Sequence, residues 1–101
     1  MFDLLRRFRE SNSQEMLKDL IAKKGAELID VRTREEYDEG HVKTSKNIPV
    51  DEIPEYANQF NKEKPYVLVC ASGMRSGNAV KFLKSRGFTQ VYNGGSWVNF
   101  L

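Results

Sequence analysis

Hydrophobic residues along this chain fall into short continuous runs that alternate with stripes of helical spacing. Each run is rich in valine, isoleucine, leucine or tyrosine and has the length of a buried strand. The most apolar run, Tyr-Val-Leu-Val-Cys at 66–70, predicts the central strand. In all, the pattern predicts strands at residues 27–31, 47–50, 66–70 and 90–93.

The stripes predict amphipathic helices, because their apolar residues recur at intervals of about three to four positions. Ser11 and Gln14 match a capping box ahead of the first stripe, which Gly25 ends. The apolar members of that stripe are Met16, Leu17, Leu20 and Ile21.

A second capping box, Thr33 with Glu36, predicts a short helix that Gly40 ends. Asp51 is expected to cap the next helix, since it directly precedes another apolar stripe. The face of that helix is formed by Ile53, Tyr56, Ala57 and Phe60.

The last long stripe follows the central strand and is ended by Gly87; its members are Ala79, Phe82 and Leu83. After the final run, Gly94 and Gly95 are expected to turn the chain into a short terminal helix. Strands thus alternate with helices throughout, which predicts an α/β fold with a parallel sheet and helices on both faces.

The length of 101 residues fits one domain with a single core. We expect a single domain over 1–101 that begins with a helical extension at 1–10. Leu4, Leu5 and Phe8 recur there at helical spacing, which indicates a short helix docked on the core. The hydrophobic share of 40% and the charged share of 30% are typical of a soluble globular chain.

The charge balance argues against a nucleic-acid partner, and the short apolar runs argue against a membrane. The 16 basic and 14 acidic residues are mixed along the chain, so no basic stripe for nucleic acid is present. No apolar run approaches the roughly 20 residues that span a bilayer. The first ten residues are too short and too charged for a secretory signal, and a cytoplasmic location is expected.

Cys70 is the only cysteine and His41 the only histidine. An internal disulfide is therefore impossible, and the spacings of Cys/His metal sites are absent. A Ser-His-Asp triad has almost no parts available, and we expect neither a metal nor a cofactor. Because His41 follows a helix stop, we interpret it as a hydrogen-bonded turn residue.

Cys70 ends the predicted central strand, at the point where the chain passes into a helix. In parallel sheets, ligands bind beyond the carboxyl ends of the strands. Backbone N–H groups of residues 71–75, the helix dipole and the Arg75 charge would each favour thiolate over thiol there. Gly73 permits the backbone angles of a tight cradle. The loop is suited to a nucleophilic thiolate and a bound anion, whereas a lone cysteine without such a loop is more often an inert core residue.

Three segments occur in an order that resembles the single-domain rhodaneses, a family of sulfurtransferases. They are Asp-Val-Arg at 30–32, Glu-Tyr-x-x-Gly-His at 36–41 and Cys-x-x-Gly-x-Arg-Ser at 70–76. The likeness covers nearly the whole chain after residue 12. It implies the rhodanese α/β fold, with a five-stranded, mainly parallel sheet.

The resemblance also implies a ping-pong reaction with Cys70 as the catalytic nucleophile. Cys70 would take a sulfane sulfur from thiosulfate or a persulfide donor and become a persulfide. It would then pass the sulfur to a thiophilic acceptor such as a thiol or cyanide, and a protein persulfide is a further candidate partner. The residues expected to bind substrate are Ala71, Ser72, Gly73, Met74, Arg75 and Ser76.

Asp30 and Arg32 lie two positions apart at the end of a predicted strand, so their side chains share a side. In the family they belong to the signature of the fold, with the arginine paired to an acidic residue such as Glu36. We interpret both as structural support for the active-site edge.

Two other functions stay open. One is a non-catalytic rhodanese-like binding module, which the presence of Cys70 and its complete loop argues against. The other is a phosphatase or arsenate reductase, whose loop has one more residue between cysteine and arginine and usually a histidine where this chain has Val69. Four residues separate Cys70 from Arg75, which favours sulfane sulfur over phosphate, and no second cysteine is present to resolve an arsenate reductase intermediate.

Overall fold

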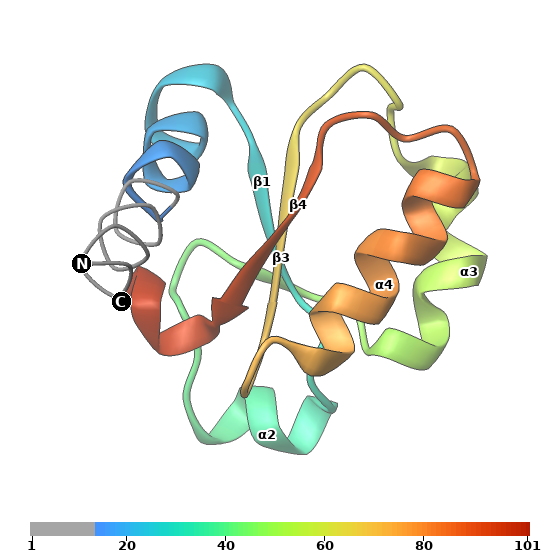
Figure 1. Ribbon diagram of the computed structural model, residues 1–101. Coiled ribbons are helices and arrows are strands. Elements are labelled where there is room, and N and C mark those ends of the chain that lie inside the picture. Colours follow the sequence, from blue (N-terminus) through green and yellow to red (C-terminus); the bar gives the residue numbers. More distant parts are fainter. Residues whose placement is uncertain (1–13) are drawn as a thin grey trace, which may run out of the picture.

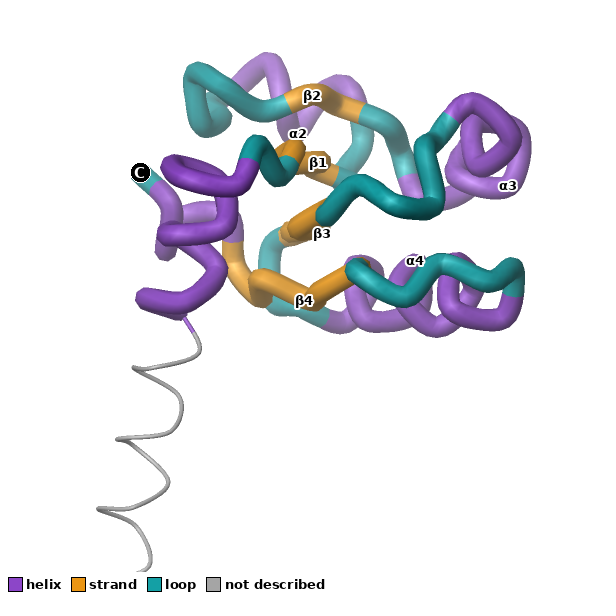
Figure 2. The backbone as a smooth tube through the Cα atoms, turned by 90° about the horizontal axis from the view of Figure 1, so that it is seen from above, coloured by secondary structure: helices purple, strands orange, loops and turns teal. Residues whose placement is uncertain are grey.

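Residues 14–101 are described by the computed structural model, and the predicted helix at 1–10 and the Ser11 cap lie outside them. Four strands form one sheet in the order β2-β1-β3-β4, and every neighbouring pair is parallel; β1, β3 and β4 are labelled in Figure 1, and all four strands in Figure 2. The strands are β1 (Glu27–Asp30), β2 (Lys46–Asn47), β3 (Tyr66–Cys70) and β4 (Val91–Ser96). The predicted α/β fold with a parallel sheet is confirmed.

The expectation of five strands is wrong for the described residues, which form four. Residues 14–24, which precede β1, are helical. Leu17 is buried, and Leu20 and Ile21 pack against the same hydrophobic cluster. The segment is thus the helix that the sequence pattern predicted. The fifth strand is implied only by the family resemblance, because the apolar runs themselves predict four strands. Met16, also expected on the buried face, is 49% exposed.

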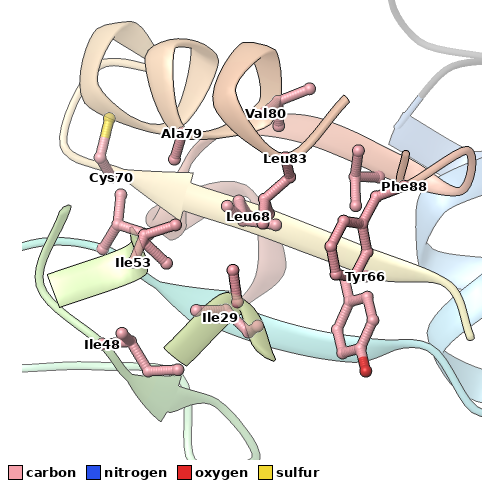
Figure 3. Packing of buried hydrophobic residues seen from close by; sticks show 13 residues of the cluster. Ile29, Ile48, Ile53, Tyr66, Leu68, Cys70, Ala79, Val80, Leu83 and Phe88 are labelled. Carbon is pink, nitrogen blue, oxygen red and sulfur yellow. The ribbon is translucent and has the colours of Figure 1, made fainter. Parts of the chain in front are cut away.

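Helices cover both faces of the sheet, as predicted (Figure 2). One face packs against α3 (Ile53–Tyr56) and α4 (Met74–Ser85). The other packs against helical residues 14–24 and the C-terminal 3-10 helix η3 (Trp97–Phe100). Successive residues of β3 face the two sides in turn. Its members Tyr66, Leu68 and Cys70 join the α3 and α4 side (Figure 3), and Val67 and Val69 join the other.

The second predicted strand is shorter than expected, because only Lys46–Asn47 pairs as a strand. The N–H groups of Ile48 and Val50 still donate to the carbonyls of Asp30 and Val31, both at 3.0 Å. Pro49 between them has no N–H to extend a ladder, so regular pairing stops there.

The chain then turns through the 3-10 helix η1 (Val50–Glu52) directly into α3, which the 3-10 helix η2 (Ala57–Gln59) extends. Asp51 lies inside η1, and no side-chain hydrogen bond caps η1 or α3, so the predicted Asp51 cap is wrong. The remaining helix, α2 (Arg34–Glu39), begins with the predicted capping box of Thr33 and Glu36.

Gly94 and Gly95 lie inside β4 instead of forming the predicted turn. Leu68 pairs with Asn93 and Val69 with Gly95, so Gly94 is the extra residue of a bulge. A Cβ on Gly94 would lie 2.8 Å from a methyl group of Val69, so glycine is the residue that fits. The predicted terminal helix follows the strand as η3.

Candidate functional site

Cys70 is the last residue of β3, at the carboxyl edge of the sheet, as the sequence predicted. Residues 71–73 form a short loop, and α4 begins at Met74. The Cys70 side chain is fully buried, and its sulfur points toward the first turn of α4 (Figure 3). The thiol therefore sits where a strand ends and a helix N-terminus begins.

Three hydrogen-bond donors converge on the sulfur of Cys70. The Gly73 N–H donates to Sγ at 2.9 Å, and the N–H and hydroxyl of Ser76 lie 3.5 and 3.4 Å from it. Gly73 has a φ of 98°, in the left-handed region that favours glycine. A Cβ at Gly73 would also lie 3.1 Å from the Cα of Gly95. We call residues 70–76 the sulfur cradle.

These donors favour the ionised thiol. Burial of Cys70 by itself raises its pKa, because a desolvated thiolate is unfavourable. The Ser76 hydroxyl and the backbone N–H groups of Ser76, Gly73 and Ser72 outweigh this effect, so that the pKa of Cys70 is lowered overall. The cradle is therefore suited to a thiolate nucleophile that needs no separate base.

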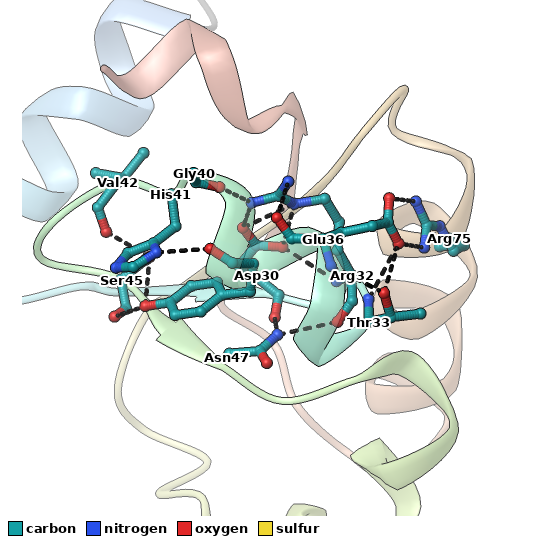
Figure 4. Close-up of polar contacts among 11 residues, drawn as sticks. Asp30, Arg32, Thr33, Glu36, Gly40, His41, Val42, Ser45, Asn47 and Arg75 are labelled. Atoms are coloured by element: carbon teal, nitrogen blue, oxygen red, sulfur yellow. Dashed lines mark hydrogen bonds and ion pairs between the residues drawn. The ribbon is translucent and has the colours of Figure 1, made fainter.

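The guanidinium of Arg75 forms a bidentate ion pair with Glu36 of α2 (Figure 4). The two N–O distances are 2.7 and 3.0 Å. The hydrogen bond from Arg75, together with those from Thr33, lowers the pKa of Glu36 to about 2. In return, the hydrogen bond to Glu36 raises the pKa of Arg75. The positive charge of Arg75, which the sequence analysis expected to favour the Cys70 thiolate, is thus compensated by the Glu36 carboxylate. The ion pair connects the cradle to α2.

Asp30 and Arg32 form a buried ion pair at the end of β1 (Figure 4). The guanidinium reaches both carboxylate oxygens, at 2.7 to 3.0 Å. Arg32 also donates to the carbonyls of Gly40, at 2.7 Å, and Glu36, at 3.2 Å. Its acidic partner is therefore Asp30, and the expected pairing with the Glu36 carboxylate is wrong. The ring of Trp97 lies over the same guanidinium, 4.3 Å from its central carbon.

The side chains of the other predicted loop residues make no hydrogen bond to the sulfur. Ala71 and Ser72 are exposed, and Met74 is 77% exposed. Gly73 and Ser76 form the inner part of the cradle and bond directly to Sγ. The structure thus divides the predicted segment into an inner pair that holds sulfur and an outer rim that faces solvent.

His41 follows Gly40, the C-cap of α2, and is hydrogen-bonded as predicted, although the turn itself lies at residues 43–44. Its ring stacks on Tyr37 with centroids 3.8 Å apart, and its Nδ1 lies 2.7 Å from the Tyr37 carbonyl oxygen. These contacts are made within one turn of the chain and involve no residue of the cradle.

Sequence reasoning missed Asn93, which lies on β4 next to the bulge. Its side chain hydrogen-bonds to both Gly73 and Ser76, the two residues that bond to the sulfur. The only local signal is its place before the glycine pair, which gives no indication of contact with a loop 17 to 20 residues earlier.

Among residues 14–101, no three histidine, cysteine, aspartate or glutamate side chains gather in a position to share a metal ion. The same part of the chain has no helix with the length and hydrophobicity to cross a membrane.

Comparison with known proteins adds independent evidence on the family. The family model described as Rhodanese-like domain matches residues 13–100. The crystal structure of a rhodanese-like domain protein from Staphylococcus aureus superposes with a TM-score of 0.73 at 36% identity, over 84% of this chain and 83% of that one.

Two curated relatives match most of this chain. The uncharacterized protein YqhL of Bacillus subtilis is 38% identical over 68 residues, which are 67% of this chain and 54% of YqhL. The thiosulfate sulfurtransferase GlpE of Coxiella burnetii is 29% identical over 75 residues, which are 74% of this chain and 70% of GlpE. The matched part of the chain therefore spans about half the length of YqhL and a larger share of GlpE.

Proposed function

The chain belongs to the rhodanese-like domain family, and on that premise we propose that it is a sulfurtransferase with Cys70 as its nucleophile. The observation that carries the proposal is the convergence of three donors on the Cys70 sulfur. Donors in this arrangement stabilise a thiolate, which attacks sulfur without help from a general base. The similarity to a thiosulfate sulfurtransferase supports the same class of reaction.

In the first half-reaction, the Cys70 thiolate attacks the outer, sulfane sulfur of thiosulfate. A bond forms between Sγ and that sulfur, while the sulfur–sulfur bond of thiosulfate breaks and sulfite leaves with its electron pair. The negative charge of the product lies on the outer sulfur of the Cys70 persulfide. A small persulfide donor reacts in the same way and releases its thiolate.

In the second half-reaction, a thiolate or cyanide attacks the outer sulfur of the Cys70 persulfide. The bond between Sγ and that sulfur breaks, and Sγ keeps the electron pair and returns to the thiolate. Each half-reaction exchanges one sulfur–sulfur bond for another sulfur bond, so neither a redox cofactor nor a proton transfer is required.

Donor access depends on the outer rim of the cradle. Because Cys70 is buried, a donor reaches Sγ only when part of the cradle moves, and we assign this movement to residues 71–74, three of which are exposed. We assign the backbone N–H groups of Ala71 and Met74, two exposed residues, with the half-exposed Arg75, to the anionic part of the donor. Gly73 and Ser76 are assigned to Sγ itself.

The geometry gives less support to the two alternative functions. A binding module without catalysis would have no use for a cradle whose donors lower the pKa of its cysteine. A phosphatase must surround several phosphate oxygens, whereas the N–H groups of Gly73 and Ser76 converge on a single sulfur atom.

Intact-protein mass spectrometry after incubation with thiosulfate tests the proposal. The protein should gain the mass of one sulfur atom, and cyanide or a small thiol should remove it. The Cys70→Ser variant serves as the control, and it should show neither the adduct nor turnover while keeping a folded circular dichroism spectrum. An unchanged wild-type mass under turnover conditions would rule out the sulfurtransferase function.

A further inference from the structure

Asn93 binds both residues that hold the Cys70 sulfur, although its side chain makes no hydrogen bond to the sulfur itself. Its Nδ2 donates to the Gly73 carbonyl at 2.9 Å. Its Oδ1 lies 2.7 Å from the Ser76 hydroxyl and accepts from the Gly95 N–H at 2.9 Å. One side chain of β4 therefore contacts the cradle at two points.

The backbone partners determine which way the Asn93 amide faces. The Gly73 carbonyl only accepts hydrogen bonds, so the amide atom facing it is Nδ2. The Gly95 N–H only donates, so the atom facing it is Oδ1. Since Oδ1 is an acceptor, the Ser76 hydroxyl beside it must donate its hydrogen.

This hydrogen bond competes with the one to Cys70, because a serine hydroxyl has a single hydrogen. While the hydrogen lies between Ser76 and Asn93, it is not available to Sγ, 3.4 Å from the hydroxyl oxygen. A neutral Cys70 thiol can then donate its own hydrogen to that oxygen. When Cys70 is ionised, a charge-assisted bond draws the hydroxyl hydrogen toward the sulfur.

We propose that Asn93 is a positioning residue that acts on Cys70 through the single hydroxyl hydrogen of Ser76. The inference rests on Cys70 being the nucleophile of the proposed function. Asn93 has a separate effect through the Gly73 carbonyl, which it holds while the Gly73 N–H binds Sγ.

The two hydrogen positions match two states of the proposed reaction. In the free thiolate, the Ser76 hydrogen faces Sγ. Once Sγ is bonded to the transferred sulfur, the negative charge lies on the outer sulfur and Sγ becomes a weak acceptor. The hydrogen then returns to Asn93 Oδ1, so the buried Ser76 hydroxyl has a partner in both states.

Alkylation by iodoacetamide, followed across a pH series, tests this competition. Four proteins are compared: the wild type, Asn93→Ala, Ser76→Ala and the double variant. Removing Oδ1 frees the hydroxyl hydrogen for the thiolate, but only where Ser76 is present. At pH values below the midpoint of wild-type alkylation, Asn93→Ala should speed alkylation of Cys70 more when Ser76 is present than when it is absent. The first effect is the alkylation rate of Asn93→Ala divided by that of the wild type. The second is the rate of the double variant divided by that of Ser76→Ala. We expect the excess to be on the order of threefold to tenfold.

A control variant at another asparagine and a second substitution of Asn93 test whether the effect is specific to the Asn93 acceptor. Asn58→Ala, which removes an exposed asparagine of η2, should leave the alkylation profile unchanged. Asn93→Asp retains an acceptor and strengthens it with a charge, so it should slow alkylation more when Ser76 is present than when it is absent. The proposal would be overturned if Asn93→Ala changed the alkylation rate equally with and without Ser76. If Asn93→Ala does not fold, the same comparison is made with Asn93→Asp.

Alkylation reports the thiolate whether or not sulfur is transferred. A protein that takes up no sulfur from thiosulfate but shows the coupling would refute the proposed function and retain the role of Asn93. Sulfur uptake without coupling between Asn93 and Ser76 would support the proposed function and refute the role of Asn93.

Discussion

Arg75 and Glu36 are joined by two hydrogen bonds across 39 positions of the sequence. Arg75 lies in the first turn of α4, beside the sulfur cradle, and Glu36 lies in the first turn of α2. The same carboxylate accepts from the backbone N–H and hydroxyl of Thr33 in the capping box. One side chain therefore stabilises the start of α2 and holds the helix that follows Cys70.

Replacing Glu36 with glutamine keeps an acceptor for the capping box and removes the charge that faces Arg75. In the fold, the pKa of Glu36 is lowered from 4.5 to about 2, so its ionised form stabilises the folded state at neutral pH. That contribution is lost as the pH falls from about 4.5 toward 2. Because both side chains are 35% exposed, we expect Glu36→Gln to lose no more than about 1 kcal/mol of unfolding free energy near neutral pH.

Urea unfolding of both proteins, from about pH 7 down to about pH 3, measures this contribution. The difference in unfolding free energy should shrink as the pH falls, because the wild-type carboxylate takes up a proton and the glutamine cannot. A difference that stays constant over the series would contradict the assigned role of the Glu36 charge.

Ser76→Ala should raise the pKa of Cys70, because it removes one of the donors to the sulfur. Arg75→Ala should raise it less, since Glu36 already compensates the Arg75 charge. The pH at half-maximal iodoacetamide alkylation measures both effects, with the wild-type midpoint expected below that of free cysteine. A larger effect of Arg75→Ala than of Ser76→Ala would show that the arginine acts directly on the thiolate.

Asp30→Asn should destabilise the fold strongly, because it leaves the buried Arg32 without a counter-charge. Breaking a buried ion pair by removal of one partner costs about 3–5 kcal/mol. Arg34→Ala is the matched control, since it breaks an ion pair with Glu52 whose arginine side chain is 59% exposed. The urea midpoint should fall sharply for Asp30→Asn and stay nearly unchanged for Arg34→Ala. Similar midpoints for the two variants would refute the bracing role of Asp30.

The elements that the sequence predicted well are those determined by local pattern. The strand at 66–70 has the predicted bounds, because a strand buried on both faces is a continuous apolar run. The capping box of Thr33 and Glu36 forms as predicted, because its contacts span three residues. Cys70 lies at the carboxyl edge of the sheet because its position follows from the end of that strand.

The features that the sequence did not predict depend on contacts between distant segments. The partner of Arg75 is Glu36, and nothing in the spacing of the two residues indicates that α2 packs beside the cradle. Asn93 reaches Ser76 because it pairs with Leu68 across the sheet and so shares the face that packs against α4. Glycine is typical of turns, which is why the sequence predicted a turn at Gly94. Its place in a bulge depends instead on the side chains from distant segments that pack against it.

Gly94→Ala should destabilise the protein through steric overlap. The added Cβ would lie 2.8 to 2.9 Å from side-chain carbons of Val67, Val69 and Phe100, which are packed against the bulge. Overpacking of this kind typically costs about 1–3 kcal/mol. Gly40→Ala is the control, because its φ of 168° suits any residue and its Cβ would make an ordinary 3.4 Å contact with Trp97. Thermal unfolding should separate the two variants, and equal melting temperatures would contradict the packing argument.

The length of the cradle should separate sulfur transfer from phosphoryl transfer. Four residues lie between Cys70 and Arg75, and the N–H groups of Gly73 and Ser76 both point at one sulfur atom. A phosphoryl group presents several oxygens, so a loop that binds it must extend farther around the anion. The wild type should therefore transfer sulfur from thiosulfate and show no turnover of p-nitrophenyl phosphate.

Inserting a glycine between Gly73 and Met74 tests this argument in the same fold. The added residue widens the loop and displaces the Gly73 N–H from the donors of Ser76, so sulfur transfer should fall by about tenfold or more. Both substrates are assayed on both proteins, with circular dichroism to show that the variant is folded. Phosphatase activity in the variant is not required, because a general acid for the leaving group is not provided by the insertion. Efficient phosphate hydrolysis by the wild type that is abolished in Cys70→Ser would refute the loop-length argument, because the unmodified cradle would then accommodate a phosphoryl group.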